Sequence, residues 1–264
     1  MTSLPEIGFG TGQLQGERAY DAVIAALQSG YQLIDTGAIY GNETEVGRAI
    51  LASQINRDDM CVITKGAHDE DQHGYKTALE QFEASLARLA LDYVDYYLVH
   101  WPVNPTKRQE TWRAYEEIHA SGRAREIGVS NYGIHHLQEL AGSAIQPAVN
   151  QIEFHPYIFA EQKDVLSYCQ NNGVAVIGYS TFADGQADHD PIVQTIATNH
   201  KITPRQVLIR WSMQHAVVPL IRSGSPDHIA ENIQATDFEL SSTEMAKLDA
   251  LRGNRQFRDP RLPP

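Results

Sequence analysis

The chain alternates short apolar runs with longer segments in which apolar residues recur every three or four positions. Runs of roughly four to eight β-branched and aromatic residues are typical of buried strands, and the longer spacing is typical of amphipathic helices. The clearest strands read MCVITK at 60–65, YVDYYLVH at 93–100 and GVAVIGY at 173–179. The full set of predicted strands is 7–12, 31–35, 60–65, 93–100, 125–130, 147–154, 173–179 and 216–222. The predicted helices lie at 17–29, 43–53, 75–90, 108–121, 162–171, 190–200 and 204–214.

Strands that alternate with helices along a chain pair in parallel, and eight of them are the number that closes a barrel. No low-complexity tract and no Gly/Ser linker interrupts the alternation. We therefore predict an α/β fold in which residues 1–264 form one eight-stranded (β/α)8 TIM barrel, with a short β-hairpin at the N-terminus.

The glycines near the N-terminus suggest an alternative fold. Gly8, Gly10 and Gly12 precede a predicted helix, and Asp35 ends the next strand, as in the dinucleotide-binding fingerprint of a Rossmann domain. The third glycine of that fingerprint would fall on Gln13, so the spacing that carries its mechanism is absent. None of the twelve tyrosines has a lysine four positions later, as a short-chain dehydrogenase would require. The barrel is the better interpretation.

Composition and charge narrow the class of protein. A formal charge of −12 argues against a nucleic-acid surface, which needs clustered Lys and Arg. No stretch approaches the roughly 20 apolar residues of a membrane span, and residues 1–12 lack the basic start and apolar run of a signal peptide. Cys61 and Cys169 each lie in an apolar segment without a second cysteine nearby, which suits a reducing compartment. We expect a cytoplasmic protein without nucleic-acid or membrane partners.

Ionisable side chains fall at the ends of three predicted strands. Asp35 ends the second strand, Lys65 the third and His100 the fourth, and Tyr40 follows five residues after Asp35. The carboxyl ends of barrel strands form the catalytic face of this fold, so the four side chains should converge there. Each alone has a simpler explanation, such as a helix cap for Asp35 or a core position for His100. Together they form a coherent proton-transfer site.

Such a site suits the reduction of a carbonyl, which needs an acid to protonate the oxygen as a hydride reaches the carbon. A free tyrosine has a pKa of about 10, and lowering it by about two units implies roughly 2.7 kcal/mol of differential stabilisation. We expect the ammonium of Lys65 to lower the pKa of Tyr40, and Asp35 to hold Lys65 charged and oriented. His100 would donate a hydrogen bond to the substrate oxygen. Tyr40 is then the proton donor.

In these segments the chain resembles the aldo-keto reductases. The segment DTGAIYGNE at 35–43, continuing to Val46-Gly47, is similar to the first signature of that family. Thr64-Lys65, LVHWP at 98–102 and IGVSN at 127–131 match further blocks in the expected order. The resemblance implies an NADPH-dependent enzyme that reduces small aldehydes, ketones or keto-sugar acids to alcohols. It is closest to the bacterial branch that acts on methylglyoxal and 2,5-diketo-D-gluconate. The resemblance implies four catalytic residues, which are Asp35, Tyr40, Lys65 and His100.

The resemblance also implies where a nicotinamide coenzyme binds. Ser130, Asn131 and Gln151 lie at the ends of predicted strands and match the positions that hold the carboxamide in the family. Tyr179 matches the aromatic residue that stacks on the nicotinamide ring, and Ser180 follows it. Because these residues lie on successive strands near one barrel face, we favour this role over turn chemistry and packing.

The last strand leads into the predicted phosphate site. Ser225-Pro226 is typical of a helix N-cap followed by proline at the first helical position, where free N–H groups favour an anion. Arg222-Ser223 stands where the family commonly has Lys-Ser, and Glu231-Asn232 matches its pair at the adenine end. His228 replaces a second basic residue of the family. We therefore expect the enzyme to use NADPH as its coenzyme, with a modest preference over NADH. NADH is kept as a second candidate coenzyme.

No metal site is expected. The run His68-Asp69-Glu70-Asp71-Gln72-His73 is interpreted as a solvated loop, and His135-His136 as a helix surface. No His-x-His pair occurs, which argues against a metal-dependent hydrolase. Two alternatives from other classes stay open: a regulatory barrel that binds the coenzyme but turns over slowly, and a hydrolytic or isomerising barrel.

The substrate pocket is predicted to be roomy. Gly12 and Ala67 stand where aromatic residues are common in the family, and Trp101 directly follows His100, where it would flank the carbonyl. Because apolar lining contributes roughly 25 cal/mol per Å² buried, we expect polar or bulky dicarbonyls to compete well with simple aromatic aldehydes. The family resemblance points to a monomer.

Overall fold

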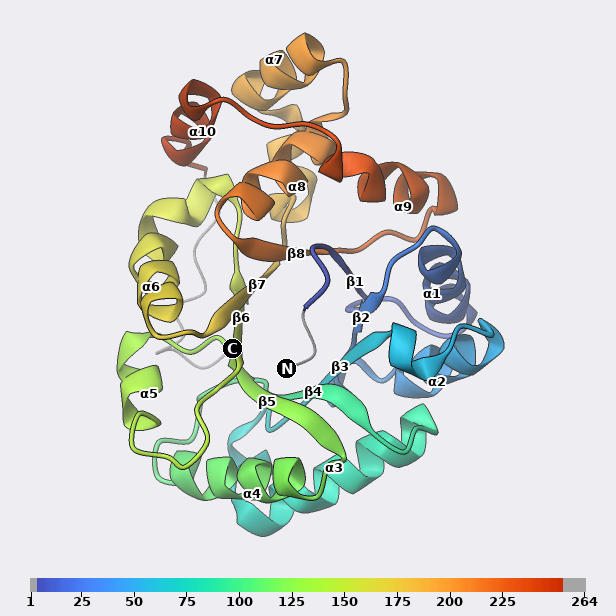
Figure 1. The fold of residues 1–264 in the computed structure, drawn as a ribbon, viewed down its shortest axis with the longest axis vertical. Helices are drawn as coiled ribbons and strands as arrows, with labels where there is room; N and C mark the ends of the chain where they lie inside the picture. The colour runs from blue at the N-terminus through green and yellow to red at the C-terminus, as the bar shows by residue number, and fades with distance from the viewer. Residues whose placement is uncertain (1–3, 254–264) are drawn as a thin grey trace.

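Eight parallel strands close into a barrel in the computed structural model, which describes residues 4–253. Each strand pairs with its neighbours in chain order, and the last pairs with the first, so that helices surround a closed ring (Figure 1). The predicted (β/α)8 barrel is confirmed, and every predicted strand overlaps an observed one. The strands are β1 (Gly8–Gly10), β2 (Leu33–Asp35), β3 (Cys61–Gly66), β4 (Val94–Val99), β5 (Ala124–Ser130), β6 (Val149–Glu153), β7 (Ala175–Tyr179) and β8 (Val217–Ile221).

The helices follow the strands around the outside of the ring. They are α1 (Glu17–Gln28), α2 (Glu43–Ala52), α3 (Tyr75–Leu89), α4 (Arg108–Ala120), α5 (Ile134–Glu139), α6 (Phe159–Asn171), α7 (Pro191–His200), α8 (Pro204–Gln214), α9 (Pro226–Asn232) and α10 (Ser242–Asp249). The sequence pattern missed α5 and α10, because six and eight residues are too few to establish a helical period. The expected N-terminal β-hairpin is absent from the described residues. Residues 4–7 contain no strand and are too few for two strands and a turn, and residues 1–3 lie outside the described part.

The interior of the barrel explains why the ionisable residues meet. Every second residue of a strand points to the same face. An apolar cluster contributed mainly by the strands contains Leu33, Cys61, Ile63, Tyr96, Leu98, Val149, Ile177 and Leu220. Four of these apolar residues are each followed, two positions later, by a polar residue. These polar residues are Asp35, Lys65, His100 and Gln151. The same strand faces that carry the apolar cluster therefore carry polar side chains at the carboxyl ends.

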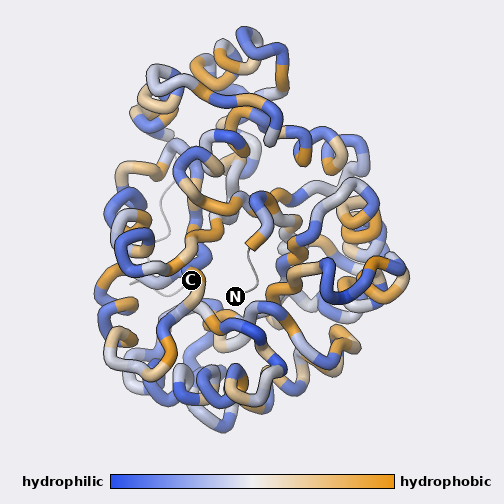
Figure 2. The backbone as a smooth tube through the Cα atoms, in the orientation of Figure 1, coloured by the Kyte–Doolittle hydropathy of each residue, from blue (hydrophilic) through white to orange (hydrophobic). Residues whose placement is uncertain are grey.

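A larger apolar cluster joins the strands to the helices. The α3 residues Phe82, Leu86 and Leu89 belong to it, as the predicted helical face requires. Figure 2 shows hydrophobic and hydrophilic residues alternating along the outer helices. Each buried Leu or Phe side chain contributes about 1.5–3 kcal/mol. This packing holds the strands rigidly, so the polar side chains at their ends have fixed positions.

Two glycines permit close packing inside the barrel. A Cβ on Gly8 would lie 2.4 Å from Cδ2 of Leu33, and a Cβ on Gly128 would lie 2.6 Å from Cγ2 of Val149. Gly8 therefore serves strand packing rather than a phosphate-binding turn. Together with the closed barrel, this excludes the Rossmann interpretation.

Both cysteines, Cys61 and Cys169, are buried free thiols. Among the helices of residues 4–253, none combines the length and apolar character that a bilayer crossing demands.

Candidate active site

Lys65 and Asp35 form a buried ion pair at the carboxyl ends of β3 and β2. Nζ of Lys65 lies 2.6 and 2.7 Å from the two carboxylate oxygens of Asp35, and it donates a further 2.6 Å hydrogen bond to the carbonyl of Thr36. The Lys65 side chain has no exposed surface. Burial disfavours the ammonium, but the attraction and hydrogen bonding of Asp35 and Tyr40 together outweigh burial, and the pKa of Lys65 is raised above its usual value. Lys65 therefore stays charged and immobile.

Tyr40 lies beside this pair, at the end of a 3-10 turn, Ala38–Tyr40, that follows β2. Nζ of Lys65 is 5.0 Å from the centroid of the Tyr40 ring. Burial raises the pKa of Tyr40, and the Lys65 charge opposes this rise without reversing it. This corrects the expectation of a lowered pKa, because lost hydration outweighs the neighbouring ammonium. The phenol therefore keeps its proton near neutral pH, as a proton donor must.

His100 follows β4 and makes an edge contact with Tyr40, with ring centroids 5.6 Å apart. Burial and the charge of Lys65 hold the pKa of His100 well below its usual value, so the imidazole is neutral. Its Nδ1 is buried without a hydrogen-bond partner among the described residues. Nε2 is not among the buried atoms without a partner, so we assign the hydrogen to Nε2, where a ligand can accept it. A neutral Nε2–H suits a hydrogen bond to a carbonyl oxygen.

The residues expected to hold the carboxamide are joined to these groups by hydrogen bonds. Nε2 of Gln151 donates to Oδ2 of Asp35 at 2.7 Å, and Oγ of Ser130 donates to the Gln151 carbonyl at 2.9 Å. Nδ2 of Asn131 donates to the His100 carbonyl at 3.1 Å, and its Oδ1 accepts from the Tyr179 hydroxyl at 2.7 Å. The structure thus brings together all four predicted side chains. Ser180, directly after β7, has a left-handed backbone with φ of 57°.

The predicted phosphate end lies where β8 leads into α9. Ser225 is the N-cap of α9 and Pro226 its first residue, as the sequence predicts. The backbone N–H of Ser225 donates to Oγ of Ser223 at 3.1 Å, and the exposed Arg222 donates to the side chain of Gln13 in the loop after β1. Arg222 therefore reaches across to the first βα loop.

The α9 helix also carries the residues expected at the adenine end. Asn232 is fully buried, yet neither side-chain atom has a hydrogen-bond partner among residues 4–253. Leaving a buried amide without hydrogen-bond partners costs free energy, and a bound polar ligand would supply the missing partners. His228 is exposed and Glu231 is half-buried on the same helix.

Arg18 is a candidate that the sequence reasoning missed. It lies in the first turn of α1, with Nη2 3.1 Å from the position of a Cβ on Gly224. It is exposed and has no hydrogen bond or ion pair within residues 4–253. Its position beside the loop after β8 depends on tertiary structure, so no local motif could have indicated it.

The run at 68–73 departs from the expected solvated loop. Asp69, Glu70 and Asp71 are exposed, but the His68 side chain is only 19% exposed and packs against His100. His73 is fully buried, and burial lowers its pKa to about 4. The acidic residues are solvated while both histidines turn inward.

The prediction that residues 135–136 lie on a helix surface is correct for only one of the two histidines. His135 is exposed, but His136 is buried, with its Nδ1 accepting a hydrogen bond of 3.2 Å from the backbone N–H of Gly133. A two-residue motif does not show which of its members faces the core.

The three predicted pocket residues occupy different environments. A Cβ on Gly12 would lie 3.6 Å from the Tyr40 ring, so Gly12 leaves space directly beside the candidate proton donor. Trp101 is 3% exposed, and its backbone N–H donates to the Ala67 carbonyl at 3.3 Å. Ala67 has no exposed surface and belongs to the larger apolar cluster, which joins the strands to the helices. Ala67 therefore does not form an open pocket wall in this structure.

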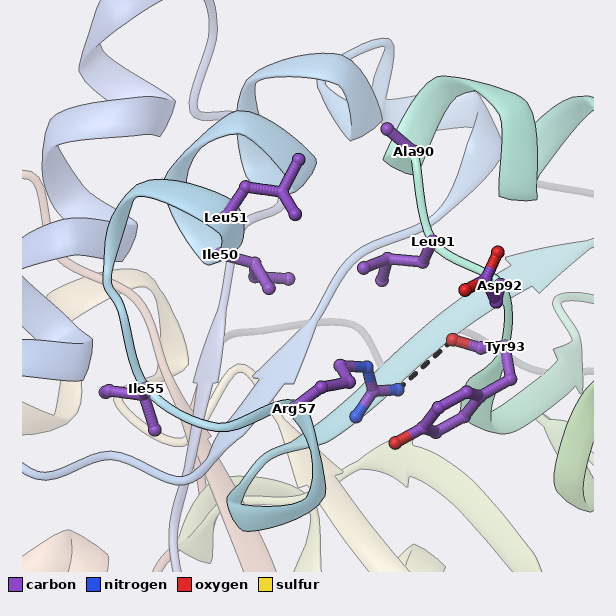
Figure 3. Close-up of a pocket in the computed structure, with 8 residues that line it drawn as sticks. All are labelled: Ile50, Leu51, Ile55, Arg57, Ala90, Leu91, Asp92 and Tyr93. Atoms are coloured by element: carbon purple, nitrogen blue, oxygen red, sulfur yellow. Dashed lines mark hydrogen bonds between the residues drawn. The ribbon is translucent and has the colours of Figure 1, made fainter.

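A separate hollow of about 250 Å³ lies at the opposite end of the barrel. Figure 3 shows the side chains that line it. It is formed where α2 and α3 end and the chain enters β3 and β4, and Arg57 donates there to the Tyr93 carbonyl at 3.2 Å. Catalytic groups of this fold come from the carboxyl ends of the strands, whereas the opposite face serves stability. The hollow is lined by Ile50, Leu51, Ile55, Arg57, Ala90, Leu91, Asp92 and Tyr93.

A (β/α)8 barrel with a tyrosine, a buried lysine–aspartate pair and a neutral histidine at its mouth has the architecture of a barrel oxidoreductase. The Aldo/keto reductase family model matches residues 6–252, and the chain belongs to this family. It is 43% identical over 250 residues to the glyoxal reductase of Bacillus subtilis (strain 168), covering 94% of this chain and 89% of the relative.

Two solved structures support the same assignment. An aldo-keto reductase from a Medee basin deep-sea metagenome library superposes with a TM-score of 0.90 at 35% identity, covering 97% of this chain and 96% of that one. A Bombyx mori aldo-keto reductase in complex with NADP superposes with a TM-score of 0.87 at 30% identity, covering 96% and 91%. The chain is an oxidoreductase of a family that uses nicotinamide coenzymes and acts on small carbonyl compounds.

Proposed function

We propose that the chain is an NADPH-dependent reductase, one barrel domain in extent, that converts small aldehydes, ketones or keto-sugar acids to alcohols. The observation that carries the proposal is the buried Lys65 ammonium, 2.6 Å from Asp35 and 5.0 Å from the ring centroid of Tyr40. A buried charge is costly unless it is paired, and this one is paired beside a phenol at the barrel mouth. That arrangement suits proton donation to a developing alkoxide.

Each catalytic candidate has a separate part in this reaction. Tyr40 holds the proton on its hydroxyl and gives it to the carbonyl oxygen. Lys65 stabilises the phenolate that forms, and Asp35 keeps the ammonium charged and oriented. His100 donates its Nε2–H to the same oxygen and so fixes the carbonyl between itself and Tyr40. Because these groups are largely withdrawn from water, their electrostatic effects are stronger than they would be in solution.

The residues present fit a nicotinamide dinucleotide. Ser130, Asn131 and Gln151 offer polar side chains for the carboxamide, and Tyr179 offers a ring face for stacking. The buried, unpartnered amide of Asn232 suits a purine edge, with Glu231 beside it. When bound, the coenzyme supplies the hydride.

Preference for NADPH rests on the cations near the loop after β8. Arg222 can bind a phosphate through its planar fork, with the hydroxyl of Ser223 beside it. Arg18 adds a second guanidinium near Gly224, and we propose that it takes over from the second basic residue of the family that His228 replaces. The complex of the Bombyx mori relative with NADP supports this choice of coenzyme.

The substrate class follows from the mouth of the barrel and from the relatives. The space beside Tyr40 left by Gly12 favours polar or branched carbonyl compounds, and Trp101 would flank them. The similarity to a glyoxal reductase supports dicarbonyls such as methylglyoxal as substrates. We further propose that the protein acts in the cytoplasm as a monomer.

The direct test has two steps. NADPH is first titrated while tryptophan fluorescence is followed, and methylglyoxal is then added while NADPH absorbance is measured. The proposal expects quenching that saturates, followed by loss of absorbance that depends on the carbonyl compound. Quenching without turnover would instead indicate a coenzyme-binding regulator. No quenching and no turnover would indicate a hydrolytic or isomerising barrel.

A further inference from the structure

The imidazole of His68 lies against the imidazole of His100. Their ring centroids are 4.9 Å apart and the planes meet at 79°, an edge contact closer than the one between His100 and Tyr40. His68 comes from the loop after β3, three residues beyond Lys65. His68 and Tyr40 therefore each make an edge contact with His100, the residue proposed to bind the reacting oxygen, and the proposed reaction gives no task to His68.

The loop holds His68 in a defined orientation. Nδ1 of His68 lies 2.9 Å from Oδ1 of Asp69, and the backbone N–H of His68 donates to Oε1 of Gln72 at 3.0 Å. Asp69 and Gln72 also close a capping box around the 3-10 turn Glu70–Gln72. The ring is thereby held by its own side-chain contact and by an ordered turn.

Asp69 also decides which nitrogen of His68 is free. A carboxylate on Nδ1 favours the tautomer with the hydrogen on Nδ1, which leaves Nε2 as an acceptor. Within residues 4–253, Nε2 of His68 has no hydrogen-bond partner, and it is not sealed from solvent. An acceptor of this kind next to His100 selects a ligand that carries a hydroxyl donor near its carbonyl.

We propose that His68 is a specificity-determining residue that accepts a hydrogen bond from a hydroxyl on the carbon next to the reacting carbonyl. The preferred substrate class is then 2-hydroxy carbonyl compounds, together with dicarbonyls whose second carbonyl is hydrated. The inference rests on the proposed function and adds a substrate class to it. His100 binds the reacting oxygen, His68 the neighbouring one, and Asp69 acts as a positioning residue.

The test compares hydroxyacetone with 2-butanone, a pair of ketones that differ by a hydroxyl in place of a methyl group. The kcat/KM ratio of the two is measured for the parent enzyme and for His68→Phe, which keeps a ring against His100 but loses the acceptor. In His68→Phe, the kcat/KM for hydroxyacetone divided by that for 2-butanone should fall roughly tenfold, which corresponds to about 1.4 kcal/mol. His135→Phe, which alters an exposed histidine on α5, should keep the parental ratio.

Two further variants separate specificity from a structural role. Asp69→Asn keeps an acceptor for Nδ1 and should retain most of the ratio, whereas Asp69→Ala should lose part of it. His68→Gln restores an amide oxygen and should recover part of the discrimination, and it also serves if His68→Phe does not fold. An equal fall in kcat/KM for both ketones would overturn the inference, because His68 would then act only through packing. A parent enzyme that reduces neither ketone, methylglyoxal nor any other carbonyl would instead refute the proposed function.

Discussion

Replacing Lys65 by methionine would leave the Asp35 carboxylate inside the barrel without its counter-ion. Asp35 is 2% exposed, and of the hydrogen bonds described above it would keep only the 2.7 Å bond from Gln151. Removing one partner of a buried ion pair costs about 3–5 kcal/mol, because the other charge stays buried and uncompensated. We therefore expect Lys65→Met to lower the free energy of unfolding by about that amount. The double variant Asp35→Asn with Lys65→Met should lose less than the sum of the two single variants, since it removes both charges.

Equilibrium urea unfolding followed by tryptophan fluorescence measures these differences. Trp101, Trp112 and Trp211 are all at most 3% exposed, so unfolding changes the surroundings of each indole. A loss below about 1 kcal/mol for Lys65→Met, or strictly additive effects in the double variant, would show that the two charges are not buried and mutually dependent.

Three further predictions follow from single positions. Arg222→Ala should lower the ratio of kcat/KM for NADPH over NADH roughly tenfold or more, because hydrogen bonds to charged groups contribute about 1.5–3 kcal/mol; an unchanged ratio would place the 2′-phosphate elsewhere. His73 has a pKa lowered to about 4 from 6.5 by burial, so the unfolded chain binds its proton first. The stability present above pH 6.5 should fall by up to about 3 kcal/mol as the pH drops toward 4, and His73→Gln should show a correspondingly smaller fall in urea titrations. Gly128→Ala should cost about 1–3 kcal/mol by overpacking, while Gly142→Ala, whose Cβ would meet nothing within 4 Å, serves as the control.

The convergence of Asp35, Lys65 and His100 could be predicted from the sequence because it depends on two local rules. Side chains alternate along a strand, and the carboxyl ends of barrel strands share one face. Neither rule requires knowledge of loop shape. The meeting of Ser130 and Gln151, which are expected to hold the carboxamide, was predictable for the same reason.

The inward turn of His68 could not be predicted in this way. Ala67, directly before it, has a left-handed backbone with φ of 53°, a conformation that residues with a Cβ rarely adopt. A run of three acidic residues after His68 indicates solvation, and nothing in the run indicates the left-handed backbone directly before it. The pKa of Tyr40 was mispredicted because the degree of burial depends on packing that residue spacing does not describe.

Contacts between distant loops were also beyond sequence reasoning. Gln13 and Arg222 meet across 209 positions, and Arg18 lies beside Gly224, because the closed barrel places β1 next to β8. The closure was predictable, but the side chains that it brings together depend on loop geometry.

Single-turnover reduction by Tyr40→Phe tests most directly whether Tyr40 donates the proton. The enzyme is saturated with NADPH, mixed with methylglyoxal, and the rate of NADPH oxidation is measured together with the dissociation constant for NADPH. Loss of acid catalysis should slow this step by roughly 10²–10⁴-fold while the dissociation constant for NADPH stays nearly unchanged, since phenylalanine keeps the ring and removes only the hydroxyl. A Tyr40→Phe enzyme that oxidises bound NADPH at close to the parental rate would show that another group donates the proton.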